Sequence, residues 1–184
     1  MKIIRDIEKY SNFSEILADA AKVFSEKIFL VEEDREYSFD AFNRLVNSCS
    51  RMLASDGVSK GDIVSLVLKN SIDYLILYFA ALRMGCKVNP FPFHLGSEEI
   101  KEKLGFIGPK VVYAHVLHAD NIAAAGLSVK AVQSDKEVIL RKRLQEFSDS
   151  RYPNPDVDPD EAAFLYYSSG TTGSPKIIEY STRS

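Results

Sequence analysis

Residues 60–91, KGDIVSLVLKNSIDYLILYFAALRMGCKVNPF, decide the fold class of this chain. A short apolar strand is expected at Ile63–Leu68, and a helix is expected over Ser71–Met84. Gly85 ends that helix, and a second apolar strand follows at Lys87–Phe91. A strand, a helix and a strand in this order predict two parallel strands joined by a crossover helix.

The alternation of strands and helices continues on both sides of this unit. The elements expected before it are a helix capped by Ser11 or Asn12, a hairpin of Ile28–Glu32 with Tyr37–Phe39, and a helix capped by Ser38. The elements expected after it are a helix capped by Ser97, a strand at Lys110–Ala114, a helix at Ala119–Ala125, a strand at Val129–Gln133 and a charged helix from Asp135 to Phe147. This order predicts an α/β fold with a mostly parallel sheet flanked by helices.

The pattern divides the chain into three parts. Residues 12–147 hold the α/β units. Residues 148–161 combine prolines with aspartates and are typical of a linker or a long surface loop. Residues 162–184 begin with a buried strand at Ala162–Ser168, pass through a loop, and start a further strand at Lys176–Tyr180.

Composition excludes several classes of protein. The 184 residues include 23 Lys and Arg against 26 Asp and Glu, a formal charge of −3, so no general attraction to nucleic acid or to an anionic membrane is expected. The longest apolar run, Tyr74–Leu82, is far too short for a membrane span. Two cysteines, Cys49 and Cys86, provide no disulfide framework and are expected to be buried thiols. The first ten residues lack the apolar core of a signal peptide, so a cytoplasmic protein is expected.

The loop after the strand at Ala162–Ser168 has the composition of a polyphosphate-binding site. Residues 166–176, YYSSGTTGSPK, contain two glycines, five Ser or Thr hydroxyls and one lysine, with no acidic residue. Glycines allow backbone N–H groups to turn toward an anion, and hydroxyls and a lysine add donors. The spacing differs from that of the Walker A loop. The residue types alone leave a flexible turn between two strands as the alternative.

The string from Ser168 to Lys176 resembles the phosphate loop of the adenylate-forming enzymes. That family comprises acyl-CoA synthetases, adenylation domains of peptide synthetases and luciferase-like proteins. Tyr37–Asn43, Gly57–Val64 and, more loosely, Val88–Pro90 are similar to further segments of the family. The resemblance extends from about residue 12 to residue 184, and it implies the N-terminal subdomain of that fold.

The resemblance also implies a chemistry and a site. It implies an ATP-dependent ligase that uses Mg²⁺, activates a carboxylic acid as an acyl-adenylate, and passes the acyl group to the thiol of CoA or of a carrier protein. The residues implied in binding the ATP phosphates are Ser168, Ser169, Gly170, Thr171, Thr172, Gly173, Ser174, Pro175 and Lys176. It implies no catalytic residue and no metal ligand within this chain.

Two departures from the family pattern follow the loop. Ile177 occupies the place of a usual glycine, and Ser181-Thr182 replaces a usual Ser/Thr-His pair. Because family members are considerably longer, the chain is expected to be the N-terminal piece of such an enzyme, inactive alone. It is expected to contact the remainder of the enzyme, or to self-associate, through an exposed sheet face. The alternative is a naturally truncated, non-catalytic nucleotide-binding or protein-interaction module.

Two further groups of residues have competing interpretations. His115 and His118 are spaced like a pair of metal ligands, but no third ligand is evident, although Asp120 and His94 are present, and surface histidines are the favoured interpretation. Lys136, Arg141, Lys142 and Arg143 are expected to form a solvated helix face rather than a docking site.

Overall fold

The computed structural model describes residues 9–153, 155–168 and 176–183. Its helices are α1 (Phe13–Val23), α2 (Phe39–Ser55), α3 (Ile72–Arg83), α4 (Ser97–Ile107), α5 (Val116–Ala124) and α6 (Ile139–Leu144). Its strands are β1 (Ile28–Glu32), β2 (Arg35–Ser38), β3 (Ile63–Val67), β4 (Lys87–Pro90), β5 (Val111–His115), β6 (Val129–Gln133), β7 (Ala162–Ser168) and β8 (Lys176–Ser181).

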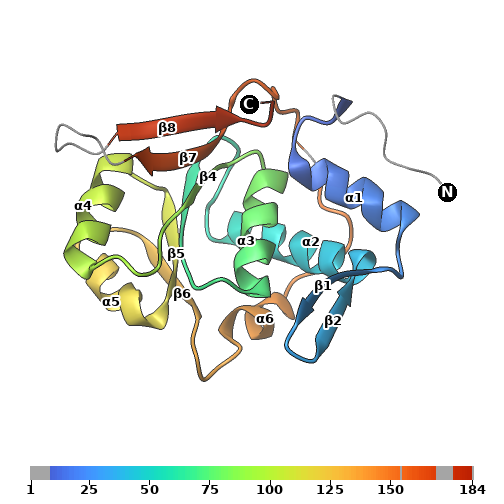
Figure 1. Cartoon of the computed structure of the whole chain (residues 1–184), viewed down its shortest axis with the longest axis horizontal. Coiled ribbons are helices and arrows are strands. Elements are labelled where there is room, and N and C mark those ends of the chain that lie inside the picture. Colours follow the sequence, from blue (N-terminus) through green and yellow to red (C-terminus); the bar gives the residue numbers. More distant parts are fainter. Residues whose placement is uncertain (1–8, 154, 169–175, 184) are drawn as a thin grey trace.

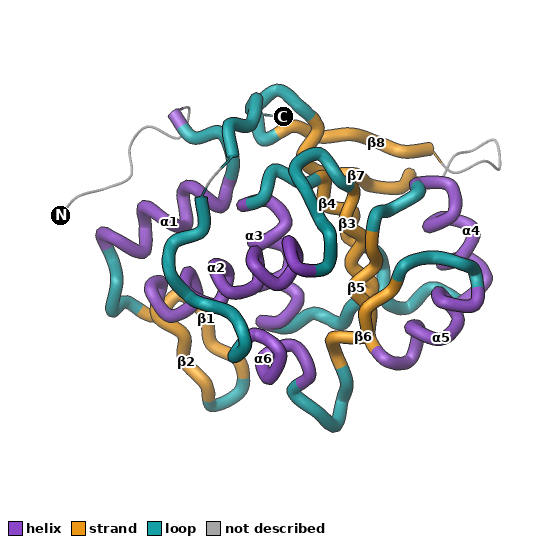
Figure 2. The backbone as a smooth tube through the Cα atoms, turned by 180° about the vertical axis from the view of Figure 1, so that it is seen from behind, coloured by secondary structure: helices purple, strands orange, loops and turns teal. Residues whose placement is uncertain are grey.

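A six-stranded sheet with the order β6-β5-β3-β4-β7-β8 forms the centre of the molecule. Strand β3 pairs in parallel with β4 and β5, β5 pairs in parallel with β6, and β4 pairs in parallel with β7. Only β8, which pairs with β7, is antiparallel. Helices α1, α2, α3 and α6 lie on one side of the sheet, and α4 and α5 lie on the other (Figures 1 and 2). The predicted α/β class and mostly parallel sheet are confirmed.

Each face of the sheet has its own core because successive residues of a strand point to opposite faces. Leu66 of β3 and Tyr113 of β5 belong to the larger core, under α1, α2, α3 and α6. Their neighbours Val67 and Val112 belong to the smaller core, under α4 and α5. Burial on both faces explains why these strands are continuous apolar runs rather than alternating ones.

Two of the expected helix caps form, and Ser71, expected as the first residue of its helix, is a cap as well. Asn12 accepts from the N–H groups of Ser14 and Glu15, Ser38 accepts from that of Ala41, and Ser71 accepts from that of Tyr74. The cap expected at Ser97 is wrong: Gly96 occupies the cap position and offers no side chain. Ser97 is instead the first helical residue.

The charged helix expected over Asp135–Phe147 is also wrong in length, since α6 has six residues. Asp135 is hydrogen-bonded to Lys69, which keeps the start of the segment out of the helix. The solvated-face interpretation is wrong for Arg141, which pairs with Glu32 and Asp73 at 2.7 Å each. It is wrong for Arg143 too, which donates to Asp56 at 2.5 and 3.0 Å. These ion pairs attach α6 to the helical layer.

Residues 148–161 contain no helix or strand in their described part, and side chains of α2 donate hydrogen bonds to their backbone carbonyls. The Arg51 guanidinium donates to the carbonyls of Ser148, Ser150 and Arg151. The amide of Asn47 donates to the carbonyl of Asp149 at 3.1 Å. The segment therefore runs along α2, which lies about a hundred residues before it in the sequence.

The structure also bears on the expectations for the cysteines and for a membrane span. Cys49 and Cys86 are free and buried, which confirms the prediction of buried thiols. Across the described ranges, none of the helices combines the length and the apolar character that crossing a bilayer requires.

Candidate functional site

The predicted phosphate loop connects two adjacent strands at one edge of the sheet. Strand β7 ends at Ser168, β8 begins at Lys176, and these two residues are register partners. Because β7 is parallel to β4, Ser168 lies at the edge where the parallel strands have their carboxyl ends. That edge is the usual ligand-binding edge of open α/β sheets. The seven residues between, 169–175, lie outside the described residues.

Strand β7 is held in place by a buried amide. The Asn89 side chain is fully buried, and its Nδ2 donates to the carbonyl of Leu165 at 2.8 Å. Its Oδ1 accepts from the hydroxyl of Ser65 at 2.9 Å. The three residues belong to β4, β7 and β3, so one side chain joins three strands immediately before the loop.

The last aromatic residue of β7 fixes the strand against the smaller core. Tyr167 packs edge-on against Phe91, with ring centroids 5.5 Å apart, and its hydroxyl donates to the carbonyl of Lys103 in α4. The ammonium of Lys103 lies 5.5 Å from the centroid of the Tyr167 ring. Burial raises the pKa of Tyr167 well above its usual value.

Lys176 is the one residue of the predicted site whose side chain the structure describes. Its side chain is exposed, and no described acidic residue forms an ion pair with it. Its charge is therefore available at the end of the hairpin, beside the loop.

A polar cluster of Lys69, His115, Gln133 and Asp135 lies at the carboxyl ends of β3, β5 and β6. The Gln133 amide bonds to both the N–H and the carbonyl of Lys69, at 2.7 and 3.1 Å. The Lys69 ammonium lies 2.7 Å from both carboxylate oxygens of Asp135. Hydrogen bonds from Lys69 and then from His115 hold the pKa of Asp135 below its ordinary value. The cluster presents polar groups on the same edge as the loop.

His115 is a buried side chain, so the surface interpretation is wrong for it. Its Nδ1 accepts from the N–H of Leu117 at 3.2 Å, which places the proton on Nε2, 3.2 Å from Asp135 Oδ1. His118 donates through Nε2 to the carbonyl of Phe93 instead, at 3.1 Å. The two histidines therefore bond to different partners. The described part of the chain has no group of three His, Cys, Asp or Glu residues placed to hold a metal ion.

Sequence reasoning missed this cluster, although a signal was present. Lys69, His115 and Asp135 each lie at or just beyond the end of an apolar strand. The carboxyl ends of parallel strands share one edge, so residues that follow such strands gather there even when they are far apart in sequence.

The fold and the site together define an α/β domain with a Gly/Ser/Thr-rich hairpin loop at the ligand-binding edge of its sheet. Residues 17–184 match the family of AMP-binding enzymes. The chain belongs to this family, which confirms the resemblance to adenylate-forming enzymes.

Individual relatives agree with this assignment. The chain is 27% identical to the medium/long-chain-fatty-acid–CoA ligase FadD6 of Mycobacterium tuberculosis over 88% of its own length and 28% of that protein. It is 26% identical to tyrocidine synthase 1 of Brevibacillus parabrevis over 88% of its own length and 14% of that protein.

The fold is similar to that of solved adenylate-forming enzymes. ATP-bound MatB from Rhodopseudomonas palustris superposes with a TM-score of 0.83 at 23% identity, over 94% of this chain and 35% of that one. The chain thus spans about a third or less of the length of these relatives.

Proposed function

We propose that this chain is the N-terminal part of an ATP-dependent ligase that activates a carboxylic acid. The family match over residues 17–184 carries the proposal. The position of the loop supports it, because Ser168 and Lys176 bracket that loop at the carboxyl edge of the parallel sheet.

In this proposal the residues from Ser168 to Lys176 bind the β- and γ-phosphates of ATP. Ser169, Thr171 and Thr172 donate hydroxyl hydrogen bonds, and Gly170 and Gly173 let the backbone approach the phosphates. Ser174 adds a further donor, and Pro175 restrains the backbone before the lysine. Lys176 stabilises the negative charge that develops on the leaving pyrophosphate, which is electrostatic rather than acid–base catalysis.

The proposed reaction has two steps. An oxygen of the carboxylate attacks the α-phosphorus of ATP, the bond from that phosphorus to the bridging oxygen breaks, and pyrophosphate leaves with the bond's electrons. A thiolate, from CoA or a carrier protein, then attacks the carbonyl carbon of the acyl-adenylate and displaces AMP. The described residues supply no group to these bond changes, so the chain's own contribution is to bind and orient the phosphates.

Mg²⁺ accompanies ATP in this proposal and neutralises phosphate charge. The proposal assigns the donors of residues 168–176 to the phosphates and assigns no metal ligand to this chain. A cytoplasmic location belongs to the same proposal, since the described thiols, Cys49 and Cys86, are free.

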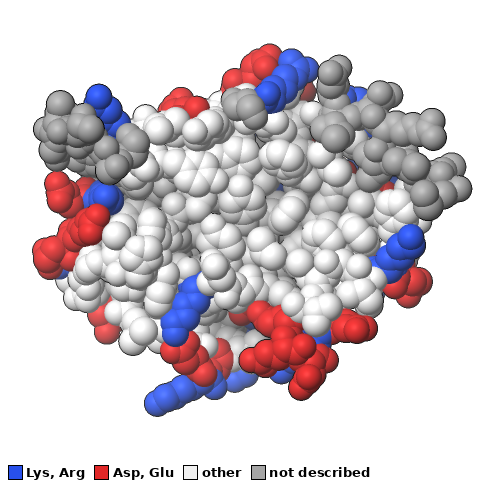
Figure 3. All heavy atoms as spheres, viewed as in Figure 1, with Lys and Arg blue, Asp and Glu red and all other residues white. Residues whose placement is uncertain are grey.

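The proposal includes a contact between this domain and the remainder of the enzyme. The face of the molecule seen in Figure 3 has few charged side chains in its central part. In the same view, Figure 1 shows α3 and the adjoining strands there. Tyr166, Ile178 and Tyr180 of the β7–β8 hairpin are 39, 39 and 44% exposed. Exposed apolar side chains such as these, beside a surface with few charges, are typical of an interface that another domain covers.

Carboxylate-dependent exchange of labelled pyrophosphate into ATP tests the proposal. The assay uses the natural polypeptide that carries this chain, whose size is first measured by immunoblot, and a panel of short, long and aromatic carboxylic acids. We expect a polypeptide much larger than 20.6 kDa that catalyses exchange with at least one class of acid. A 20.6-kDa polypeptide without exchange would favour the non-catalytic module instead.

A further inference from the structure

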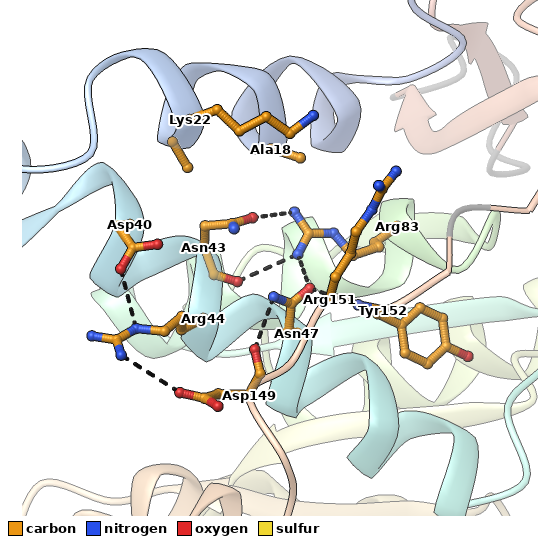
Figure 4. Close-up of a pocket in the computed structure, with 11 residues that line it drawn as sticks. Ala18, Lys22, Asp40, Asn43, Arg44, Asn47, Arg83, Asp149, Arg151 and Tyr152 are labelled. Atoms are coloured by element: carbon orange, nitrogen blue, oxygen red, sulfur yellow. Dashed lines mark hydrogen bonds and ion pairs between the residues drawn. The ribbon is translucent and has the colours of Figure 1, made fainter.

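A cavity of about 270 Å³ lies between α1, α2 and the segment that follows α6. Four of its lining side chains are cationic, namely Lys22, Arg44, Arg83 and Arg151. Two are acidic, namely Asp40 and Asp149. No lining residue comes from the sheet or from the β7–β8 hairpin, so the cavity is separate from the proposed ATP site (Figure 4).

Arg83 is a buried guanidinium without an acidic partner among the described residues. Only 2% of it is exposed, and its five N–H groups donate to the side chains and carbonyls of Ser14 and Asn43 and to the side chain of Asn47. These acceptors are all neutral, so they satisfy the hydrogen bonds without balancing the charge. Burial, and next the charge of Arg151, lowers the pKa of Arg83 to about 10.

The acids of the cavity do not compensate for this charge. Asp40 and Asp149 both face Arg44, at 3.3 and 3.8 Å (Figure 4). Lys22 has its own partner, Asp19, at 2.7 Å. Two cationic side chains, Arg83 and Arg151, therefore remain unbalanced at the cavity within the described part of the chain. A buried charge that lacks a counter-charge is costly, so an anion seated here is favoured.

Arg151 is positioned to contact such an anion directly. Its carbonyl accepts from Arg51 at 3.2 Å, and the N–H of the next residue, Tyr152, donates to Asn47 at 3.1 Å. The backbone is fixed on both sides, while the Arg151 side chain is exposed and has no hydrogen-bond or ion-pair partner in the described ranges. A guanidinium in this state presents a planar pair of donors that matches an oxyanion.

We infer that the cavity between α1, α2 and residues 149–152 is a binding site for a small oxyanion of the phosphate type. Arg151 is the direct ligand, and Lys22 also lines the cavity. The buried Arg83 guanidinium contributes a fixed positive charge beside the anion. The site does not depend on the proposed ligase activity, because it shares no residue with the loop at 168–176.

Isothermal titration calorimetry with inorganic phosphate at constant ionic strength tests this site. Because phosphate is also a ligand for the predicted loop, every protein in the series carries Lys176→Ala. In that background we expect saturable binding, and we expect Arg151→Gln to weaken it at least about tenfold through loss of a charge-assisted contact. The matched control, Lys136→Gln, removes an exposed cation elsewhere and is expected to leave the affinity unchanged.

Two results would overturn the inference. One is the absence of saturable phosphate binding in the Lys176→Ala background. The other is equal affinity with and without Arg151→Gln, which would place the bound phosphate elsewhere on the chain. Neither result bears on the ligase proposal, which is tested by pyrophosphate exchange.

Discussion

Asp56, whose side chain is 5% exposed, and Asn89, which is fully buried, are polar residues that join elements distant in sequence. Asp56, at the end of α2, accepts from Arg143 of α6 and, at 2.8 Å, from Tyr113 of β5. Asn89 joins three strands beneath the loop. A buried group that loses its partner keeps its desolvation cost, so single substitutions are most damaging at such residues.

Asp56→Asn is expected to lower the free energy of unfolding by about 2 kcal/mol at neutral pH, because Arg143 loses its charged partner. Burial opposes the ionisation of Asp56, but hydrogen bonds from Arg143 and then Tyr113 outweigh it and hold its pKa below 3.8. A carboxyl group with a lowered pKa stabilises the fold above its ordinary pKa, and this stabilisation is lost as the pH falls below it.

Urea denaturation at a series of pH values measures this effect. The difference in stability between the wild-type chain and the Asp56→Asn variant should shrink as the pH falls below 3.8. A difference that stays constant over the acid range would contradict the assigned role of Asp56.

Asn89→Ala is expected to destabilise the chain by about 3 kcal/mol, because it leaves the Leu165 carbonyl unpaired and opens a small cavity. The matched control is Asn70→Ala, at an exposed position, for which a change within about 0.5 kcal/mol is expected. Denaturation followed by circular dichroism gives both values. Equal stabilities of the two variants would show that Asn89 does not hold the strands together.

At the scale of elements, the segment after α6 restricts the turn that ends α3. Gly85 has φ +71°, and a Cβ added there would lie 2.9 Å from Val157 Cγ2, 3.1 Å from Lys60 Cγ and 3.2 Å from Pro155 Cγ. Gly126, which follows α5, has φ +78° but no atom within 4 Å of an added Cβ. The two glycines share a conformation and differ in their surroundings.

This difference predicts unequal costs for the same substitution. Gly126→Ala should cost about 1 kcal/mol, the penalty of a left-handed backbone for an alanine. Gly85→Ala should cost about 1–2 kcal/mol more, because the added methyl group also overlaps Val157. Chemical denaturation of both variants tests the comparison, and equal losses would mean that residues 155–157 do not pack on this turn.

At the scale of the whole molecule, the sheet ends on an edge strand that has apolar side chains and pairs with a described strand on one side only. Strand β8 is the last in the sheet order, and Ile178 and Tyr180 are exposed on it. Edge strands of this kind associate with other chains unless they are covered. In the proposed enzyme the remaining chain covers this region, so the 184-residue chain alone should self-associate.

Ile178→Lys is expected to reduce self-association of the isolated chain, because a lysine on an edge strand disfavours pairing with a second strand. Val31→Lys, at a position 62% exposed on the separate β1–β2 hairpin, is the matched control and should not change it. Sedimentation equilibrium over a range of concentrations distinguishes the two. A wild-type chain that remains monomeric at the highest concentration would contradict the expected self-association.

Most of the fold was predictable from local sequence, whereas features that depend on distant partners were not. The strands at Ile28–Glu32, Val129–Gln133 and Ala162–Ser168 begin and end where expected, because hydrophobic pattern and turn residues determine them. The expected length of α6 was wrong because Asp135 bonds to Lys69, which follows strand β3. Helical periodicity does not indicate such a contact, which only the shared edge of the parallel strands could suggest.

The site was predictable to a different extent. A local motif locates the loop, and the pairing of Ser168 with Lys176 puts its two ends together at the expected edge. The burial of His115 and the uncompensated charge of Arg83 depend on residues far away in the chain, so spacing alone could not reveal them.

Carboxylate-dependent pyrophosphate exchange, compared between the wild-type natural polypeptide and its Lys176→Ala variant, tests most directly whether residues 168–176 bind the phosphates of ATP. The account predicts a loss of about 10²- to 10³-fold, since one electrostatic contact to the leaving group disappears. Lys136→Ala, as the control for loss of an exposed lysine, should keep the wild-type rate. An unchanged exchange rate in Lys176→Ala would contradict the account.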